Sequence, residues 1–339
     1  MSLALHPGAV RAGRAFAPAR PPVVALVLIA AVVAVVPASL MIGSRMLSPA
    51  DLASSTGEAI ALARLDRTVL GLVVGASLGL VGALMQGLTR NPLADPGILG
   101  VNAGAALAMV TGMSVFGISS LSLNVWLAFA GAAAAMALVH GVAALGRGGA
   151  TPAKLAIAGA ILTAAATSWT SAILLLDSKT MESFRYWQIG TVAGRDLSLV
   201  VSLSPFLAIG LLLGLTSARR LNALALGDDM ARGLGRRVIA DRLVLGATIV
   251  LLAGCATALA GPIAFVGLLV PHAVRSVAGP DHRALLPLSA VAGAVLLVLA
   301  DVIGRVILPP TEVQVGVMAA AVGVPCFLAL VRRGRVGGP

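Results

Sequence analysis

The chain has 339 residues, of which 59% are hydrophobic and only 11% are charged. Its mean hydropathy of +1.02 excludes an ordinary soluble protein and indicates many membrane crossings rather than one anchor. The apolar runs are long and do not alternate with polar residues, so we expect an all-α polytopic membrane protein and not a β-barrel. The formal net charge is +11, but the basic residues stand in short clusters between apolar runs. That distribution favours membrane lipid as a partner and argues against nucleic acid.

Ten apolar segments are candidates for transmembrane helices. The N-terminal one is longer than the core of a signal peptide, so we expect it to be retained as the first span. The domain organisation expected is therefore a tail over residues 1–22, one transmembrane domain over 23–333 and a second tail over 334–339. The candidate spans are Val23–Met41, Thr68–Leu88, Ile98–Phe116, Leu123–Leu145, Ala153–Leu176, Leu197–Thr216, Leu243–Leu259, Pro262–Val277, Leu285–Val302 and Val313–Val331.

The distribution of positive charge predicts the orientation of these spans. With the N-terminus in the cytoplasm, 17 of the 24 Lys and Arg residues fall on the inner side and the other 7 on the outer side. This excess agrees with the positive-inside rule. An even number of spans returns the C-terminus to the cytoplasm, so both tails are expected there.

The longest polar interruption is Arg219–Arg242, which is too long for a plain turn. Gly227, Gly233 and Gly235 divide it into pieces that are predicted to be short helices. We interpret the segment as a docking element on the cytoplasmic face, and the alternative is a solvated loop whose arginines only fix the topology. An apolar side is expected from Leu221, Leu224 and Leu226, and a side facing water or a partner from Asp228, Asp229, Arg232 and Arg236.

Three of the arginines on the outer side, against the charge bias, stand close to the ends of expected spans. Arg64 and Arg67 precede the expected second span and share a helix face, and Arg305 follows the ninth span. One explanation is the docking of an acidic partner. The other is local pairing, with Asp66 beside the first two and Asp301 one helical turn before Arg305.

Three other segments carry local structural signals. Asp95 precedes a Pro–Gly step in the turn after the second span and is expected to cap or shape that turn. Asp177–Asp196 holds the only Tyr and one of the three Trp residues, which indicates an interfacial segment or a short helix across the outer mouth. Four-residue spacing in the second span predicts a flat strip for close helix packing, formed by Gly71, Gly75 and Gly79.

The sequence lacks the patterns of an enzyme or a metal protein. No phosphate-binding loop is present, so the chain is not expected to hydrolyse nucleotide by that route or to hold a cofactor of its own. Four scattered histidines and two distant cysteines, Cys255 and Cys326, predict no metal site. Ionisable residues are nearly missing from the centres of the spans, which weakens an ion-coupled carrier as an alternative.

Four stretches together resemble the FecCD family of ABC-importer permeases. They are Ala63–Leu107, Phe184–Asp196 (FRYWQIGTVAGRD), Ala258–Pro287 (ALAGPIAFVGLLVPHAVRSVAGPDHRALLP) and Ala300–Arg333. The resemblance implies a ten-helix permease of the type II importer fold in the cytoplasmic membrane. It also implies two cytoplasmic ATPases that use ATP and Mg²⁺, a second permease subunit, and a periplasmic or lipid-anchored binding protein. A sister subunit is favoured as the second permease, with a homodimer as the alternative.

The resemblance carries over to particular residues. The family's docking arginines match Arg64, Arg67 and Arg305, although this chain has Asp66 where the family usually has Pro. The inner gate of the family lies near Thr151 and Pro152. The family's ATPase-coupling loop matches Asn222, Leu224, Leu226, Gly227, Asp228, Asp229, Arg232, Gly235 and Arg236.

The expected cargo is iron inside a chelator, because no metal ligands line the spans and a path of small and aliphatic residues avoids tight binding. Within the family, LTRNPLADPG, LGVNAGA and LVRRG are most similar to the ferric-enterobactin branch, which implies a catecholate siderophore. Haem or cobalamin is the alternative cargo, because the vitamin B12 permeases are related.

Overall fold

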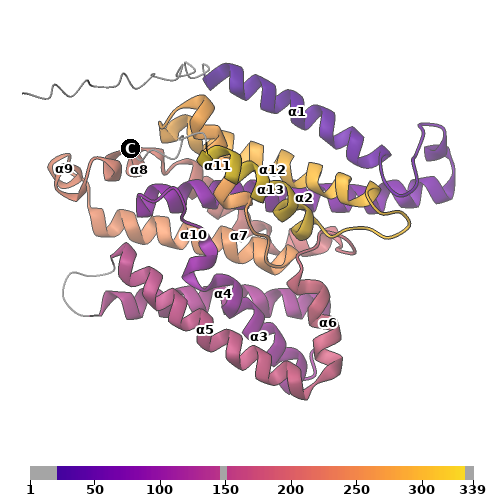
Figure 1. The fold of residues 1–339 in the computed structure, drawn as a ribbon, viewed down its shortest axis with the longest axis horizontal. Helices are drawn as coiled ribbons and strands as arrows, with labels where there is room; N and C mark the ends of the chain where they lie inside the picture. The colour runs from indigo at the N-terminus through magenta and orange to yellow at the C-terminus, as the bar shows by residue number, and fades with distance from the viewer. Residues whose placement is uncertain (1–20, 146–150, 333–339) are drawn as a thin grey trace, which may run out of the picture.

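The computed structural model describes residues 21–145 and 151–332, and every regular element within these two ranges is helical (Figure 1). Seven helices are long and apolar enough to cross a membrane. They are α1 (Pro21–Met41), α2 (Ser55–Thr89), α4 (Leu121–Ala144), α5 (Pro152–Leu176), α7 (Leu197–Leu215), α10 (Val238–Ala260) and α12 (His282–Val306).

The remaining elements are shorter. Three apolar helices, α3 (Val101–Val115), α11 (Val266–Ala278) and α13 (Val315–Arg332), occupy the expected third, eighth and tenth spans. All ten segments predicted to span the membrane are thus mainly helical, in the predicted order. The connecting elements are the 3₁₀ turns η1 (Asp51–Ala53) and η2 (Pro96–Leu99) and the helices α6 (Ser178–Gln188), α8 (Ala218–Ala225) and α9 (Asp228–Gly233). The predicted tails lie outside the described residues, apart from residues 21–22 at the start of α1.

The second span begins well before its predicted start at Thr68. Ser54 caps α2 by accepting a hydrogen bond from the Gly57 N–H at 3.1 Å. With 35 residues, α2 is about 52 Å long, which exceeds the roughly 30 Å of bilayer hydrocarbon. Arg64 and Arg67 therefore lie inside this helix rather than ahead of it.

The third and eighth spans also start differently from the prediction. Gly100 adopts a φ of 76° between η2 and α3, so the expected span from Ile98 consists of a 3₁₀ turn and then a helix. Before α11, residues 261–264 are not helical, and Phe265 has a φ of 67°. Irregular backbone at membrane depth requires protein around it, and Val266 just after it is fully buried.

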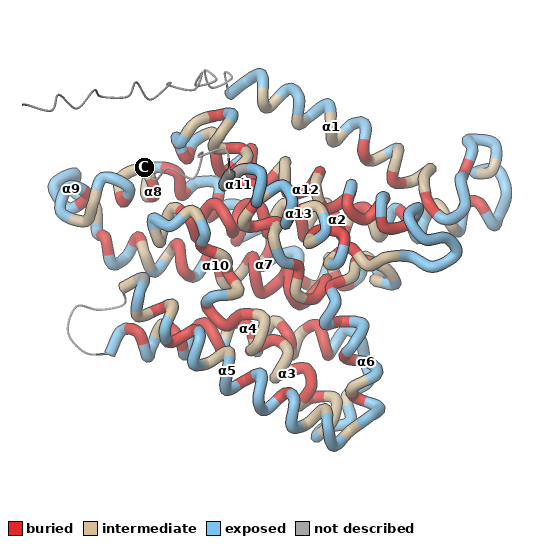
Figure 2. Tube along the Cα trace, in the orientation of Figure 1, coloured by how far each residue is buried: buried red, intermediate tan, exposed pale blue. Residues whose placement is uncertain are grey.

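The core is built around the closely packed pair α2 and α12. Figure 2 shows these two helices and α10 as mostly buried, whereas α1 and α5 are largely exposed. A Cβ added to Gly75 would collide with the backbone carbonyl of Gly293, and one on Gly79 would collide with that of Ser289. The predicted glycine strip is thus confirmed as a surface for close helix approach.

The two ends of the bundle differ in their connections. At one end lie α8 and α9, together with the start of α1 and the end of α13, and at the other lies α6, which runs across the ends of its neighbours (Figure 1). The expected short helix within Asp177–Asp196 is confirmed as α6. Asp95 caps η2 by accepting from the Gly97 N–H at 2.8 Å, as predicted. Partial burial of the Asp95 side chain raises its carboxyl pKa above the usual range.

Candidate functional site

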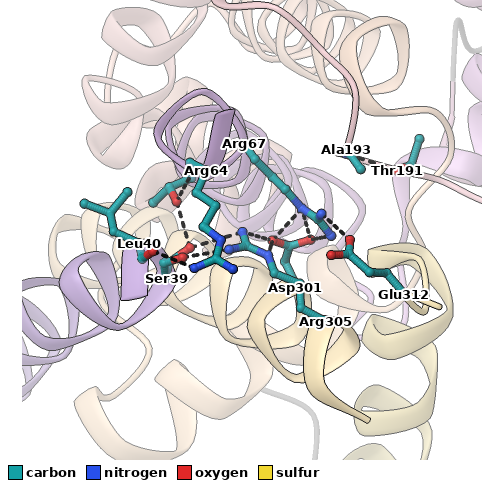
Figure 3. Close-up of polar contacts among 10 residues, drawn as sticks. Ser39, Leu40, Arg64, Arg67, Thr191, Ala193, Asp301, Arg305 and Glu312 are labelled. Carbon is teal, nitrogen blue, oxygen red and sulfur yellow. Dashed lines mark hydrogen bonds and ion pairs between the residues drawn. The ribbon is translucent and has the colours of Figure 1, made fainter. Parts of the chain in front are cut away.

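The outer arginines form one connected cluster between α2 and the C-terminal ends of α1 and α12 (Figure 3). Arg67 on α2 makes a two-pronged contact with Asp301 on α12, with Nε to oxygen distances of 2.8 and 2.9 Å. Its Nη1 also contacts Glu312, in the segment between α12 and α13, at 2.5 Å. Arg305 donates to the same carboxylate of Asp301 and, at 2.7 Å, to the backbone carbonyl of Ser39. Asp301 is therefore shared by two guanidinium groups.

Arg64 serves a different contact in this cluster. Its guanidinium donates to the backbone carbonyls of Leu40 and Met41 at 2.9 and 3.1 Å and to that of Arg45 at 2.6 Å. The last carbonyls of a helix have no partner within the helix, and a cation stabilises that end. Arg64 thereby fixes the C-terminal end of α1 against α2.

Most of the arginines in the cluster are shielded from solvent. Arg64 is 8% exposed and Arg305 only 1%, because both are surrounded by α1, α2 and α12. The alternative of local pairing is confirmed for Asp301 and Arg305. Among the described residues, Asp66 forms no ion pair with either neighbouring arginine. Arg67 and Glu312, with side chains 12% and 34% exposed, are the members that solvent or a partner can reach.

The charges in the cluster do not cancel. Three guanidinium groups face two carboxylates, Asp301 and Glu312, which leaves one excess positive charge. Sequence analysis did not single out Glu312 or Ser39 for this cluster. Glu312 gave no local signal because its partner lies 245 residues away.

The predicted docking segment forms a second site at the opposite end of the bundle. It folds into α8 and α9, which are separated at Gly227, where a φ of 104° suits glycine only. Gly235, with a φ of 76°, ends the next turn in the same way. The division of the segment into short helices by glycines is thus confirmed at these two positions.

Hydrogen bonds fix α8 to the start of α12. The Asn222 amide donates to Asp281 at 2.7 Å, and its oxygen accepts from the backbone N–H of His282 at 3.1 Å. The imidazole Nδ1 of His282 lies 2.7 Å from the same oxygen. The Arg283 N–H and the Asn222 amide together hold the pKa of Asp281 below its usual range. These contacts were not foreseen from the sequence.

Ion pairs fix α9 to its neighbours. Asp228 accepts from Arg90, at the end of α2, and from Arg242 on α10, each at 2.9 Å. Asp229 and Arg232 pair with each other at 2.8 Å on the open surface, with side chains 98% and 60% exposed. Asp228 therefore faces the bundle rather than a partner, which corrects part of the prediction, while Asp229 and Arg232 face outward as expected.

The apolar residues of this segment divide into two groups. Leu221 and Leu224 are buried in the bundle, whereas Leu226 is 57% exposed, so the three do not form one apolar side. Two residues that the sequence analysis missed, Met230 and Leu234, are also exposed, by 62% and 63%. These two residues are four apart, in α9 and at its C-cap, and that helical spacing was the available signal.

The other predicted site residues form an ion pair or begin a helix in this structure. Arg236 pairs with Asp241 at 2.6 Å. Thr151 caps α5 by accepting from the Lys154 N–H at 3.4 Å, and Pro152 is the first residue of that helix. The gate role of Thr151 and Pro152 stays a prediction. Within residues 21–145 and 151–332, no three His, Cys, Asp or Glu side chains gather where they could hold a metal.

Comparisons with known proteins place this arrangement in a family. The sequence profile of the FecCD transport family matches residues 28–333, which include both sites. The chain belongs to the FecCD transport family. This permease is accordingly a subunit of an ABC importer in the cytoplasmic membrane, which works with separate ATPase subunits and a substrate-binding protein.

Individual relatives cover most of the permease. It is 47% identical over 277 residues to the ferric enterobactin transport system permease protein FepD of Escherichia coli (strain K12), a match that covers 81% of this chain and 82% of that one. It is 45% identical over 276 residues to the Fe(3+)-citrate import system permease protein YfmD of Bacillus subtilis (strain 168), again covering 81% and 82%. A metal-chelate type ABC transporter solved in an inward-facing conformation is similar with a TM-score of 0.82 at 28% identity, over 92% of this chain and 99% of that one.

Proposed function

We propose that this permease carries ferric siderophores of the catecholate type, such as ferric enterobactin, inward across the cytoplasmic membrane. The observation that supports this cargo is the 47% identity to FepD over four-fifths of both chains. The similar identity to a ferric-citrate permease supports iron chelates as the wider class. The described residues gather no ligands for bare iron, which favours transport of the metal inside its chelator.

Uptake by the assembled importer tests this cargo. The permease would be reconstituted in liposomes with its ATPase, its second permease subunit and its binding protein, and supplied with ⁵⁵Fe-enterobactin, ⁵⁵Fe-citrate, haem or cobalamin. We expect ATP-dependent uptake of ferric enterobactin above the others. Preferred uptake of ferric citrate would refute the catecholate assignment, and preferred uptake of haem or cobalamin would favour the alternative cargo. Uptake driven by an ion gradient without the ATPase would refute the ATP-driven mechanism.

The proposed assembly has two ATPase subunits and a sister permease subunit, with a homodimer as the alternative. ATP and Mg²⁺ are used by the ATPases, and this chain is proposed to bind no cofactor. The docking of the ATPase is proposed to use the exposed edge of α8 and α9, where Leu226, Met230 and Leu234 expose apolar surface beside the Asp229–Arg232 pair. Exposed apolar side chains rimmed by charges are typical of a protein interface.

A charge placed on this edge tests the coupling role. Met230→Glu is expected to lower transport and transport-coupled ATP hydrolysis at least about tenfold, because a carboxylate would be desolvated at the centre of the interface. Leu52→Glu is the matched control, since Leu52 is an exposed apolar residue (44%) at the other end of the bundle. Equal activity of the wild type and Met230→Glu would refute the proposed contact between α9 and the ATPase.

The docking of the binding protein is proposed to use Arg64, Arg67 and Arg305, with Arg67 as the member within reach. An acidic group of the binding protein would replace Glu312 on the guanidinium of Arg67, and Arg64 and Arg305 would supply the field of positive charge behind it. The excess positive charge and the partial exposure of Glu312 (34%) support this exchange.

The exchange predicts opposite effects of two substitutions. Glu312→Gln removes the internal competitor and is expected to tighten the binding protein's affinity several-fold, whereas Arg67→Gln is expected to weaken it at least about tenfold. Surface plasmon resonance at two salt concentrations would measure both. Arg185→Gln, which changes an exposed cation on α6, is the control. Weaker binding by Glu312→Gln would refute the exchange.

A further inference from the structure

Two arginines meet at one carboxylate at the end of the bundle that carries α8 and α9 (Figure 1). Arg220, in the first turn of α8, has its Nε 3.3 Å from Asp241 Oδ1, and Arg236 has its Nη2 2.6 Å from the same oxygen. Asp241 lies in the first turn of α10 and is 7% exposed. The two guanidinium groups are therefore neighbours, and the starts of α8 and α10 lie side by side.

Arginines outnumber acids at this place. Arg219 precedes Arg220 in α8, and Arg237 follows Arg236 as the N-cap residue of α10. Both are exposed, and within residues 21–145 and 151–332 neither forms an ion pair. Four guanidinium groups thus share one carboxylate, that of Asp241, which leaves three excess positive charges. We call these four arginines the arginine corner.

The two paired arginines retain donors that face water. Arg236 contacts Asp241 through Nε and Nη2, which leaves Nη1. Arg220 uses Nε for the same carboxylate and Nη1 for the hydroxyl of Ser217 at 3.4 Å, which leaves Nη2. Their side chains are 29% and 34% exposed. The planar N–H groups of arginine match the oxygens of a phosphate group, so the corner can accept an anion.

An exposed apolar surface lies along the two membrane helices next to the corner. Its members are 43–76% exposed and consist of Leu212 and Leu215 on α7 and Ile239 and Leu243 on α10. The two helices pack directly together, since a Cβ added to Gly210 on α7 would lie 2.8 Å from the side chain of Leu252 on α10. Both are long and apolar enough to cross a membrane. We therefore expect the surface to contact hydrocarbon and the corner to lie among the headgroups.

The corner and the apolar surface are on the same side of the chain. Residues 216–217, which join α7 to α8, have right-handed helical dihedral angles. Arg219 therefore follows Leu215 at the four-residue spacing of one helix face. On α10, Ile239 and Leu243 have the same spacing, and Arg237 comes two residues before Ile239. One elongated molecule with an anionic end and hydrocarbon chains can thus contact both.

We propose that the arginine corner binds the headgroup of an anionic phospholipid in the inner leaflet. The phosphodiester lies against Arg220 and Arg236, Arg219 and Arg237 add positive charge beside it, and the acyl chains follow the apolar surface. Basic groups at the cytoplasmic ends of membrane helices attract anionic lipids. An acidic soluble protein would match the charges but not the apolar side chains at membrane depth. The site does not depend on the cargo proposed above.

Three probes separate the lipid from its parts. Dioleoylphosphatidylglycerol has an anionic headgroup and two chains, dioleoylphosphatidylcholine has the same chains without net charge, and glycerol 3-phosphate is an anion without chains. Native mass spectrometry of the full chain, freed of lipid in a neutral detergent, would measure each affinity. We expect phosphatidylglycerol to bind at least about tenfold more tightly than phosphatidylcholine. Glycerol 3-phosphate should not bind at concentrations that saturate the site with phosphatidylglycerol.

Single variants assign the preference for the anionic lipid to the corner. Arg219→Gln and Arg237→Gln are each expected to reduce it about three- to fivefold, because each removes one charge near the membrane surface. Arg219→Lys keeps the charge and should retain most of the preference. Arg283→Gln is the matched control. Arg283 is an exposed arginine in the first turn of α12, and Leu285 and Leu286 after it are buried, so no exposed apolar surface adjoins it.

Four outcomes would overturn the proposal. Equal affinity of the wild type for the two lipids would mean apolar contact alone. Binding of glycerol 3-phosphate as tight as that of phosphatidylglycerol would mean a site for a free anion. An effect of Arg283→Gln as large as that of Arg219→Gln would mean diffuse attraction to the inner face. Displacement of phosphatidylglycerol by the added ATPase subunit would assign the corner to the ATPase contact. The comparison of probes on the wild type decides the matter even where a variant does not fold.

Discussion

Replacement of Asp301 by alanine is expected to destabilise this permease more than any exposed charge substitution. Asp301 is 2% exposed and receives the guanidinium groups of both Arg67 and Arg305. Its removal leaves Arg305, 1% exposed, without an opposite charge. Breaking one buried ion pair by removing one partner costs about 3–5 kcal/mol. Arg67 keeps Glu312 as a partner, so the two losses do not add in full, and we expect a total near this range.

Unfolding of the purified permease in mild detergent, titrated with SDS and followed by gel filtration, would measure this loss. Asp229→Ala is the matched control, because its pair with Arg232 lies on the open surface and such pairs contribute about 0–1 kcal/mol. Addition of Arg305→Leu to Asp301→Ala should recover part of the loss, since the unpaired buried cation is then gone. A loss below about 1 kcal/mol for Asp301→Ala would refute the assignment of a buried charge network.

Two other substitutions test the packing and the inner contacts. Gly75→Val is expected to abolish folded protein in fluorescence-detected gel filtration, because its side chain collides with α12, whereas Gly141→Ala, with open space around it, should leave the profile unchanged. Asn222→Ala removes the hydrogen bonds to Asp281 and is expected to cost about 1–2 kcal/mol. The pKa of Asp281 is lowered in the folded state, so its contribution is complete above the unfolded value and is lost as pH falls through the folded one. The effect of Asn222→Ala should therefore shrink below about pH 4, and an equal loss at pH 3 and pH 7 would contradict this reading.

The order and type of the membrane helices could be predicted because hydropathy acts locally along the chain. Apolar runs, glycine spacing and turn residues such as Asp95 determine the structure of the residues next to them. The structure therefore has each feature at the position where the sequence predicts it. The start of α2 was missed because the residues before Thr68 are mixed in polarity, and only a capping residue, Ser54, marks the true beginning.

The contacts of the charged residues could not be predicted, because they depend on residues far away in the sequence. Arg67 and Asp301 are 234 residues apart, and nothing near Arg67 indicates that the helix containing Asp301 will lie beside it. The exposure of a side chain to solvent likewise depends on helices that are distant in the sequence. Asp228 and Asp229 are neighbours of the same type, yet one faces the bundle and the other faces solvent, because α9 presents only one side to α2 and α10.

The uninterrupted course of α2 gives the molecule a rigid rod between its two faces. Its sequence from Ser55 to Thr89 contains no proline, and proline is the usual cause of a sharp bend. The rod carries Arg64 and Arg67 near one end, and Arg90, which touches Asp228, directly follows its other end. The separation between the arginine cluster and the Arg90–Asp228 contact is thus fixed by one continuous helix, without a proline joint in between.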